Sequence, residues 1–248
     1  QWADVTVTYT DAKGDVADRD AIGFGRTPYK NTSGRNDIVS AKVTSDTKNL
    51  YFYVSTVYDI SMFDTNSSWM QLYLNVDRQT TGWYGYDFII NYQAKDTFTT
   101  TVAKYNGADG KFGFESIGEV SYRVKGNQMM IAVPLELLGV EHCDYMNFHF
   151  KWVDSDSKMT TMEQFYTEGD VAPLGRLNYV FNTVMPGSVP PAETETETTA
   201  PSEVTDSGVT TDDAIENRPS KKGCGSVIPS LLAPMALAGG AALTAKRK

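Results

Sequence analysis

The sequence is poor in the residues that most often carry catalysis or bind metals. It contains two histidines and two cysteines in 248 residues, and Cys143 and Cys224 lie in segments of very different composition. Two such cysteines do not support a disulfide framework. No G-x-S-x-G, H-E-x-x-H or Walker motif is present, and Gly23-Phe24-Gly25 lacks the third glycine of a dinucleotide fingerprint. We interpret His142 and His149 as ordinary surface or core residues, and we expect this region not to be an enzyme.

Positive charge is also scarce. Lys and Arg total 22 against 31 Asp and Glu, for a net charge of -9. An acidic chain repels a phosphate backbone, which argues against nucleic acid as a partner. The chain starts at Gln1 with neither an initiator Met nor a basic-then-apolar leader. Together with the C-terminal features described below, this start indicates a piece of a longer secreted protein.

Aromatic residues are abundant, at 12% of the chain with 14 tyrosines. Apolar and polar residues alternate in many short segments bounded by turn residues, a pattern typical of antiparallel sheets. These segments are residues 49–57, 69–77, 86–92, 98–104, 120–124, 129–133, 148–153 and 176–182. Residues 135–140 read as a helical turn that begins after Pro134 and ends at Gly139. The sequence predicts an all-β domain over residues 1–185, an antiparallel β-sandwich of the jelly-roll or immunoglobulin-like two-sheet kind.

The composition changes abruptly at Pro186. Residues 186–220 are rich in Thr, Glu and Pro and are predicted to form a disordered linker. Residues 221–248 follow, with 19 uncharged residues at 227–245 before Lys246-Arg247-Lys248. This order is similar to the C-terminal anchors of Gram-positive surface proteins, although Gly-Cys224-Gly-Ser stands where an LPxTG-type motif would be. We expect a membrane-anchor or sorting segment, with the domain outside the cell. Cleavage or lipidation at Cys224 and a lasting transmembrane span are alternatives.

Aromatic residues also indicate a binding surface. In residues 69–77 the apolar Met70, Leu72 and Leu74 share one face, which leaves Trp69, Gln71 and Tyr73 on the other. Trp83, Tyr84 and Tyr86 follow in a glycine-flanked turn. Sugar rings stack on aromatic side chains, so these six residues are candidate saccharide ligands. The alternative is that Trp69 and Trp83 cap the core.

Residues 11–20 place four carboxylates around Gly14. Calcium prefers several oxygen ligands on a flexible loop, so Asp11, Asp15, Asp18 and Asp20 are a candidate structural Ca²⁺ site. The loop does not match an EF-hand. The alternative is a solvated turn in which Arg19 pairs with one aspartate.

Three segments together resemble the family 9 carbohydrate-binding modules and related DOMON-like β-sandwiches. They are the strand at 50–59 that ends in Asp59, the strand at 69–77 that ends in Asp77, and the strand-to-helix step at 129–139 through Pro134. The resemblance spans residues 4–182. It implies a non-catalytic module, often stabilised by calcium, appended to glycoside hydrolases or other polysaccharide-active surface proteins.

We therefore expect a carbohydrate-binding module that binds a polysaccharide or oligosaccharide at the bacterial cell surface. It would be extracellular, held to the membrane or cell wall by its C-terminal tail, and it could follow an upstream glycoside hydrolase. One alternative is a structural or adhesive spacer without sugar binding. A glycoside hydrolase domain that uses a carboxylate pair such as Asp154 and Asp156 is the other.

Overall fold

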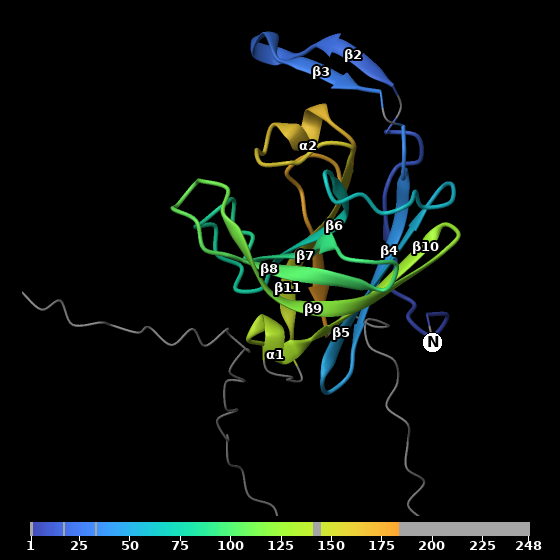
Figure 1. Cartoon of the computed structure of the whole chain (residues 1–248), viewed down its shortest axis with the longest axis vertical. Helices are drawn as coiled ribbons and strands as arrows, with labels where there is room; N and C mark the ends of the chain where they lie inside the picture. The colour runs from blue at the N-terminus through green and yellow to red at the C-terminus, as the bar shows by residue number, and fades with distance from the viewer. Residues whose placement is uncertain (1, 17, 33, 141–144, 184–248) are drawn as a thin grey trace, which may run out of the picture.

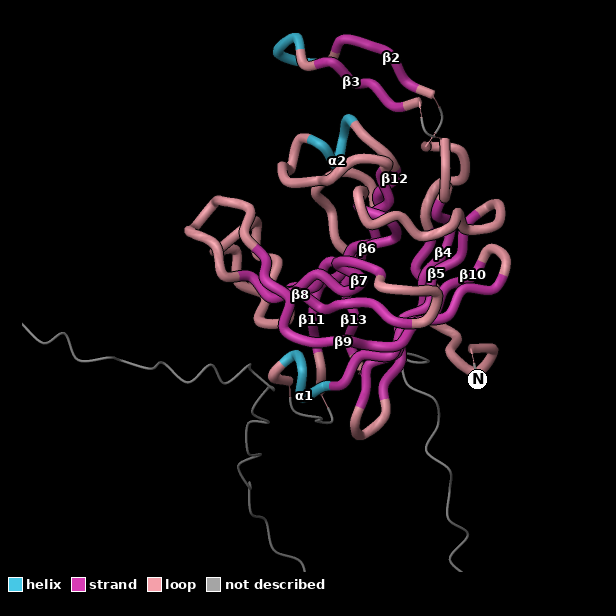
Figure 2. Tube along the Cα trace, viewed as in Figure 1, coloured by secondary structure: helices cyan, strands magenta, loops and turns pink. Residues whose placement is uncertain are grey.

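The structure is a computed structural model that describes residues 2–16, 18–32, 34–140 and 145–183. Within these ranges the chain is mostly antiparallel β-structure, as the sequence predicts. Figures 1 and 2 show the course of the chain. The elements are β1 (Tyr9–Thr10), β2 (Arg19–Ile22), a 3-10 turn (Phe24–Arg26), β3 (Pro28–Asn31), β4 (Ile38–Ser45), β5 (Asn49–Thr56), β6 (Ser68–Asn75), β7 (Phe88–Ala94), β8 (Thr99–Tyr105), β9 (Phe114–Lys125), β10 (Gln128–Pro134), α1 (Leu135–Leu138), β11 (Asn147–Ser155), α2 (Gln164–Thr167), β12 (Asp170–Ala172) and β13 (Tyr179–Asn182).

The described strands form one continuous sheet and one hairpin, where the sequence predicted two sheets. The large sheet has 11 strands in the order β1-β4-β5-β10-β9-β8-β7-β6-β11-β12, and β13 also pairs with β11. Strand β9 joins the two parts of the large sheet, because it pairs with β8 through residues 114–121 and with β10 through residues 122–125. A register shift at Val102/Ala103 marks a bulge in this pairing, and bulges bend and twist a sheet.

The continuous sheet curls, so that strands far apart in its order face each other. Phe52 in β5 lies 6.2 Å from Phe148 and 6.3 Å from Phe150 in β11, measured between ring centroids. These rings belong to the main core, which fills the inside of the curl with residues from β4 to β11 and from β13.

A second apolar cluster lies on the other face of β6, β7 and β11. Tyr73, Ile89 and Val153 come from these strands, and Trp83 and Phe165 pack against them from outside the ladder. The loop after β6 carries Trp83, and α2 carries Phe165. Strand β6 is consequently buried along its whole length, on both faces.

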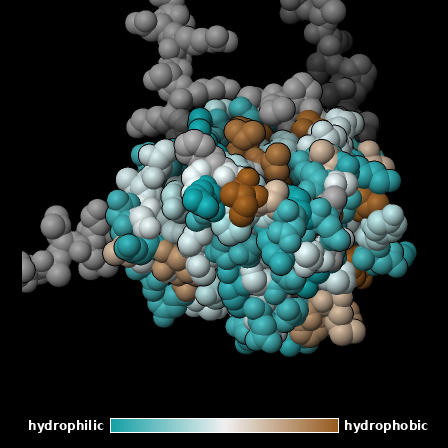
Figure 3. Space-filling view, turned by 90° about the horizontal axis from the view of Figure 1, so that it is seen from above, coloured by the Kyte–Doolittle hydropathy of each residue, from teal (hydrophilic) through white to brown (hydrophobic). Residues whose placement is uncertain are grey.

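The β2–β3 hairpin stands away from the sheet at the top of Figure 1. Arg19 Nη2 and Asn31 Nδ2 both donate to the carbonyl oxygen of Gly169 and so hold the hairpin to the segment before β12. Gly169 has φ +52°, and a Cβ there would lie 1.9 Å from the Asp154 carbonyl oxygen, so only glycine fits. Seen from this end, in Figure 3, the surface is largely hydrophilic with small separate apolar patches.

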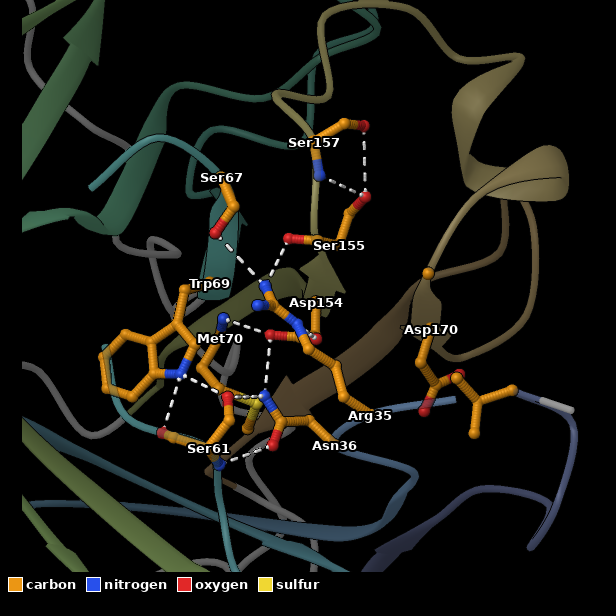
Figure 4. A network of polar contacts seen from close by, with 12 residues as sticks. Arg35, Asn36, Ser61, Ser67, Trp69, Met70, Asp154, Ser155, Ser157 and Asp170 are labelled. Atoms are coloured by element: carbon orange, nitrogen blue, oxygen red, sulfur yellow. Dashed lines mark hydrogen bonds and ion pairs between the residues drawn. The ribbon is translucent and has the colours of Figure 1, made fainter. Parts of the chain in front are cut away.

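A buried carboxylate ties the segment before β4 to β6 and β11 (Figure 4). Asp154 is fully buried. It accepts hydrogen bonds from Arg35 Nε at 2.9 Å, Asn36 Nδ2 at 2.9 Å and the Met70 amide at 3.0 Å. Arg35 also donates to Ser67 Oγ. Burial raises the pKa of Asp154 even though these donors favour its ionised form. The Asp154 carboxylate thus has a structural role.

Removal of this carboxylate should destabilise the whole domain. Asp154→Ala removes the carboxylate that pairs with Arg35 and accepts from the buried Asn36 Nδ2 and Met70 amide, and breaking a buried ion pair costs about 3–5 kcal/mol. We expect chemical denaturation to show a loss of that size. Asp156→Ala, two residues along and exposed, should change the free energy of unfolding by about 0.5 kcal/mol or less. Equal effects of the two substitutions would contradict the structural role of Asp154.

Candidate functional site

The structure buries most of the aromatic residues that the sequence proposed as sugar ligands. Trp69 is 3% exposed, Trp83 1% and Tyr73 0%, and Gln71 and Tyr86 are also buried. Of the six candidates only Tyr84 is exposed, at 48%. The expectation that these residues form an open platform is therefore wrong for all but Tyr84.

These aromatic residues are buried because other side chains cover the outer face of β6. From Leu72 to Leu74 the alternation separates the two faces correctly, since Leu72 and Leu74 face the main core and Tyr73 faces the second cluster. The second face is covered as well, because the Trp83 ring lies 5.8 Å from that of Tyr73 and the Phe165 ring lies 5.7 Å from it. Trp69 instead packs into the main core, where its indole nitrogen donates to the Ser61 carbonyl.

Of the four aspartates proposed for calcium, the structure brings two together with a third from far along the chain. Carboxylate oxygens of Asp11, Asp15 and Asp170 all lie within 4.8 Å of one another. Asp18 and Asp20 are exposed, and Asp20 lies on the hairpin with Lys30 Nζ at 3.7 Å. We call Asp11, Asp15 and Asp170 the acidic cluster.

The acidic cluster contains carboxylate oxygens without partners. Asp11 Oδ2 and both carboxylate oxygens of Asp15 are covered from solvent and accept no hydrogen bond. Asp170 accepts from the Ile38 amide at 2.7 Å, and neighbouring Asp37 accepts from the Gly14 amide. Buried carboxylates normally have partners or hold a metal. Oxygen ligands of this kind fit Ca²⁺, with backbone carbonyls and water able to complete its shell.

Burial and mutual repulsion make the acidic cluster hard to ionise without a cation. Burial, together with the charge of Asp15, raises the pKa of Asp11 to about 6. Burial chiefly, with repulsion from Asp15, Asp11 and Asp37, raises the pKa of Asp170 to about 8. Lys151, buried close by, donates to the Pro173 carbonyl. Burial lowers the pKa of Lys151 to about 7 although Asp11 and Asp170 oppose that shift. One lysine therefore does not neutralise the acidic cluster.

The acidic cluster lies where the two ends of the curled sheet meet. Asp11 follows β1 directly, and Asp170 begins β12 at the other end of the strand order. Tyr9 Oη donates to the Val180 carbonyl, and Tyr179 Oη donates to the Thr10 carbonyl, so that side chains join β1 to β13. We call this junction the seam. A cation bound by the acidic cluster would join its two sides.

A separate cavity of about 600 Å³ opens on the outer face of β4, β5, β10 and β9, a size typical of ligand sites. We call it the outer groove. Its lining residues are Trp2, Asp4, Thr44, Ser45, Asp46, Tyr51, Ser121, Tyr122, Arg123, Met130, Ile131 and Ala132. None of these was a sequence candidate. The outward alternation of Tyr51 and Tyr53 in residues 49–57 was the available signal.

Tyr51 is held in place at one side of the outer groove. Its hydroxyl donates to Asp46 at 2.7 Å, and the same carboxylate accepts from the amides of Lys48 and Asn49. The Tyr51 side chain is half-buried, and it lies opposite Ala132 in the β5–β10 ladder. The small side chain of Ala132 leaves space beside the ring.

The N-terminal arm, residues 2–5, also lines the outer groove, through Trp2 and Asp4. The Trp2 ring lies 5.3 Å from that of Tyr53, with its N–H directed to the Met130 sulfur. Lys42 Nζ donates to the carbonyls of Trp2 and Val5 at 2.9 and 2.8 Å. The outer groove thus combines the rings of Trp2 and Tyr51 with polar groups.

The remaining sequence candidates do not form a site in the described residues. Asp154 is committed to Arg35, and Asp156 is exposed, so this pair does not face a common cleft. His149 is half-buried, while His142, Cys143 and Cys224 lie outside the described residues. No helix within the described ranges has the length and hydropathy needed to cross a bilayer. No known family model, curated protein or solved structure matches this chain.

Calcium should stabilise the domain through the acidic cluster. A ligand that binds only the folded state at 100 times its Kd adds about 2.7 kcal/mol, which raises the Tm of a domain of this size by about 5–11 °C. We expect chelation to reverse this increase, measured by thermal unfolding. Asp170→Asn should abolish the response, and Asp20→Asn should retain it. A response that depends on Asp20 rather than on Asp170 would show that the wrong carboxylates were assigned.

The calcium effect should also grow with pH. The folded-state pKa values of Asp11 and Asp170 are raised from 3.8 to about 6 and 8. The metal-free fold therefore holds protons that the unfolded chain releases, and the contribution of these groups to stability is lost as pH rises from about 4 towards 8. Above about pH 7, Lys151 offsets part of this loss, because its folded-state pKa is lowered. Calcium displaces the retained protons, so the calcium-induced rise in Tm should be small at pH 5 and larger at pH 7.5.

Proposed function

We propose that residues 1–185 form a non-catalytic carbohydrate-binding module whose saccharide lies in the outer groove. The observation that carries the proposal is the half-buried ring of Tyr51 beside the cavity of about 600 Å³. The C–H faces of a pyranose pack against aromatic rings, and its hydroxyls need polar partners. Asp46, Ser121 and Arg123 supply such partners around the cavity.

Pre-organisation of the ring supports this proposal. The Tyr51 hydroxyl is fixed by Asp46, so little side-chain entropy is lost when a sugar stacks on it. The N-terminal arm is fixed as well, since Lys42 donates to the carbonyl of Trp2. Side chains already held in a binding geometry favour a recognition role over a merely exposed surface.

We infer that calcium has a structural part in this module. The acidic cluster offers Asp11, Asp15 and Asp170 as ligands, and bound Ca²⁺ would neutralise their repulsion and secure the seam. We also infer that the curled sheet is a β-sandwich whose two layers are bridged by β9. The contacts of Phe52 with Phe148 and Phe150 across the main core support this interpretation.

A structural or adhesive spacer is the second candidate function. The burial of Trp69 and Trp83 favours it, because a spacer uses its tryptophans in the core. Both functions suit the proposed extracellular location, with the linker at 186–220 and the anchor at 221–248 holding the domain to the envelope. Those two segments lie outside the described residues. A measurement of saccharide binding distinguishes the carbohydrate-binding module from the spacer.

Binding through the outer groove is tested with Tyr51→Ala. A stacked aromatic ring contributes about 0.5–1.5 kcal/mol beyond burial, so its removal should weaken binding by roughly tenfold at most. The measurement is affinity electrophoresis of the whole chain in gels that contain hydroxyethyl cellulose, galactomannan or polygalacturonate. Circular dichroism confirms that the variant folds.

Tyr84→Ala is the matched control, since Tyr84 is the exposed member of the original candidates. It should be retarded like the unmodified chain. If Tyr84→Ala abolishes retardation and Tyr51→Ala does not, the binding site lies in the loop after β6 instead. No retardation of the unmodified chain by any of the three polymers would favour the spacer.

A further inference from the structure

We propose that the outer groove selects neutral polysaccharides and discriminates against acidic ones such as polyuronates. The inference rests on the proposed function and adds the chemical class of the ligand. It follows from the charges that line the cavity, from how each is held, and from the shape of the cavity floor.

Three of the residues that line the outer groove are charged, namely Asp4, Asp46 and Arg123. Two are carboxylates, so the lining is negative overall. Burial disfavours the ionised form of Asp46, but hydrogen bonds from the Tyr51 hydroxyl and the amides of Lys48 and Asn49 outweigh this and lower its pKa. Asp46 therefore carries a full negative charge at neutral pH, next to the ring on which a sugar would stack.

The one cation of the lining is engaged elsewhere. The guanidinium of Arg123 lies over the Phe98 ring, 4.7 Å from its centroid. Its Nη1 donates to the Tyr122 carbonyl at 2.7 Å and to the Phe98 carbonyl at 3.5 Å. A bidentate arginine clamp for a carboxylate requires a free fork of N–H donors, and these contacts occupy part of that fork. Arg123 therefore has only Nε and Nη2 left for a ligand, and its guanidinium is held over the Phe98 ring rather than beside Tyr51.

The polar groups near the ring suit hydroxyls instead. An ionised carboxylate such as Asp46 accepts hydrogen bonds only, and every sugar hydroxyl can donate one. A uronate carboxylate has no proton to donate and meets a like charge. A like-charge contact at about 4 Å in water weakens binding roughly fivefold.

The cavity floor restricts what can lie beside Tyr51. Ala132 faces Tyr51 directly in the ladder, and its methyl group leaves the hollow into which a pyranose face would pack. Ala132→Leu fills this hollow without adding charge. Because Ala132 is only half-buried on the outer face of the sheet, the fold should tolerate the larger side chain.

The experiment compares two neutral polymers with one acidic polymer on the whole chain. Affinity electrophoresis in hydroxyethyl cellulose, galactomannan and polygalacturonate gives a retardation constant for each. We expect at least one neutral polymer to bind about tenfold more tightly than polygalacturonate at low salt. Asp46→Asn keeps an oxygen acceptor for the same donors, and it should reduce the ratio of neutral to acidic constants about fivefold.

Asp59→Asn is the charge-matched control, since Asp59 is exposed beyond the other end of β5, and it should leave the ratio unchanged. Ala132→Leu should weaken neutral binding at least tenfold while circular dichroism stays the same. Two results would overturn the proposed selectivity and leave saccharide binding intact. One is that polygalacturonate binds as tightly as the neutral polymers, and the other is that Asp46→Asn does not change the ratio of neutral to acidic constants. Failure of every polymer to retard the chain would overturn the proposed function as well.

Discussion

The architecture depends on how the two ends of one curled sheet are held together. In the described residues the strand order starts at β1 and ends at β12, and no backbone ladder joins these ends. Side chains do so instead, through Tyr9, Tyr179 and the Asp170 carboxylate on the Ile38 amide. The acidic cluster lies in the same seam. Its repulsion opposes closure, so closure is coupled to whatever neutralises those carboxylates, either protons or a cation.

The sequence predicted the local structure well and the enclosure of the sheet poorly. Alternation located β5, β6, β7, β10 and β11 within a few residues, and Pro134 and Gly139 marked the bounds of α1. Alternation also separates the two faces of a strand, but it does not say what covers each face. The rings of Trp83 and Phe165 cover the outer face of β6, so Tyr73 is fully buried although its position in the pattern resembles that of the half-buried Tyr51 and Tyr53.

For the candidate sites as well, the sequence predicted residues that are close along the chain and missed residues that only the fold brings together. Asp11 and Asp15 were predictable because they share one loop with Gly14. Asp170 was not, because only the closure of the seam brings β12 to that loop. The outer groove is assembled from four strands and the N-terminal arm. Its dimensions depend on the ladder that sets Ala132 opposite Tyr51. The alternation within one strand does not show which residues of a distant strand lie opposite it.

The seam and the outer groove are connected through the first residues of the chain. Residues 2–5 form one side of the groove, and residues 11–15 contribute two of the three carboxylates of the acidic cluster. Lys42 and the buried side chain of Val5 fix the segment at one end, and the contacts of β1 with β4 continue that anchoring. Neutralising the acidic cluster removes a repulsion that pushes the same segment away from the body. Stability at the seam and the position of Trp2 in the groove therefore both depend on one short stretch of backbone, residues 2–15.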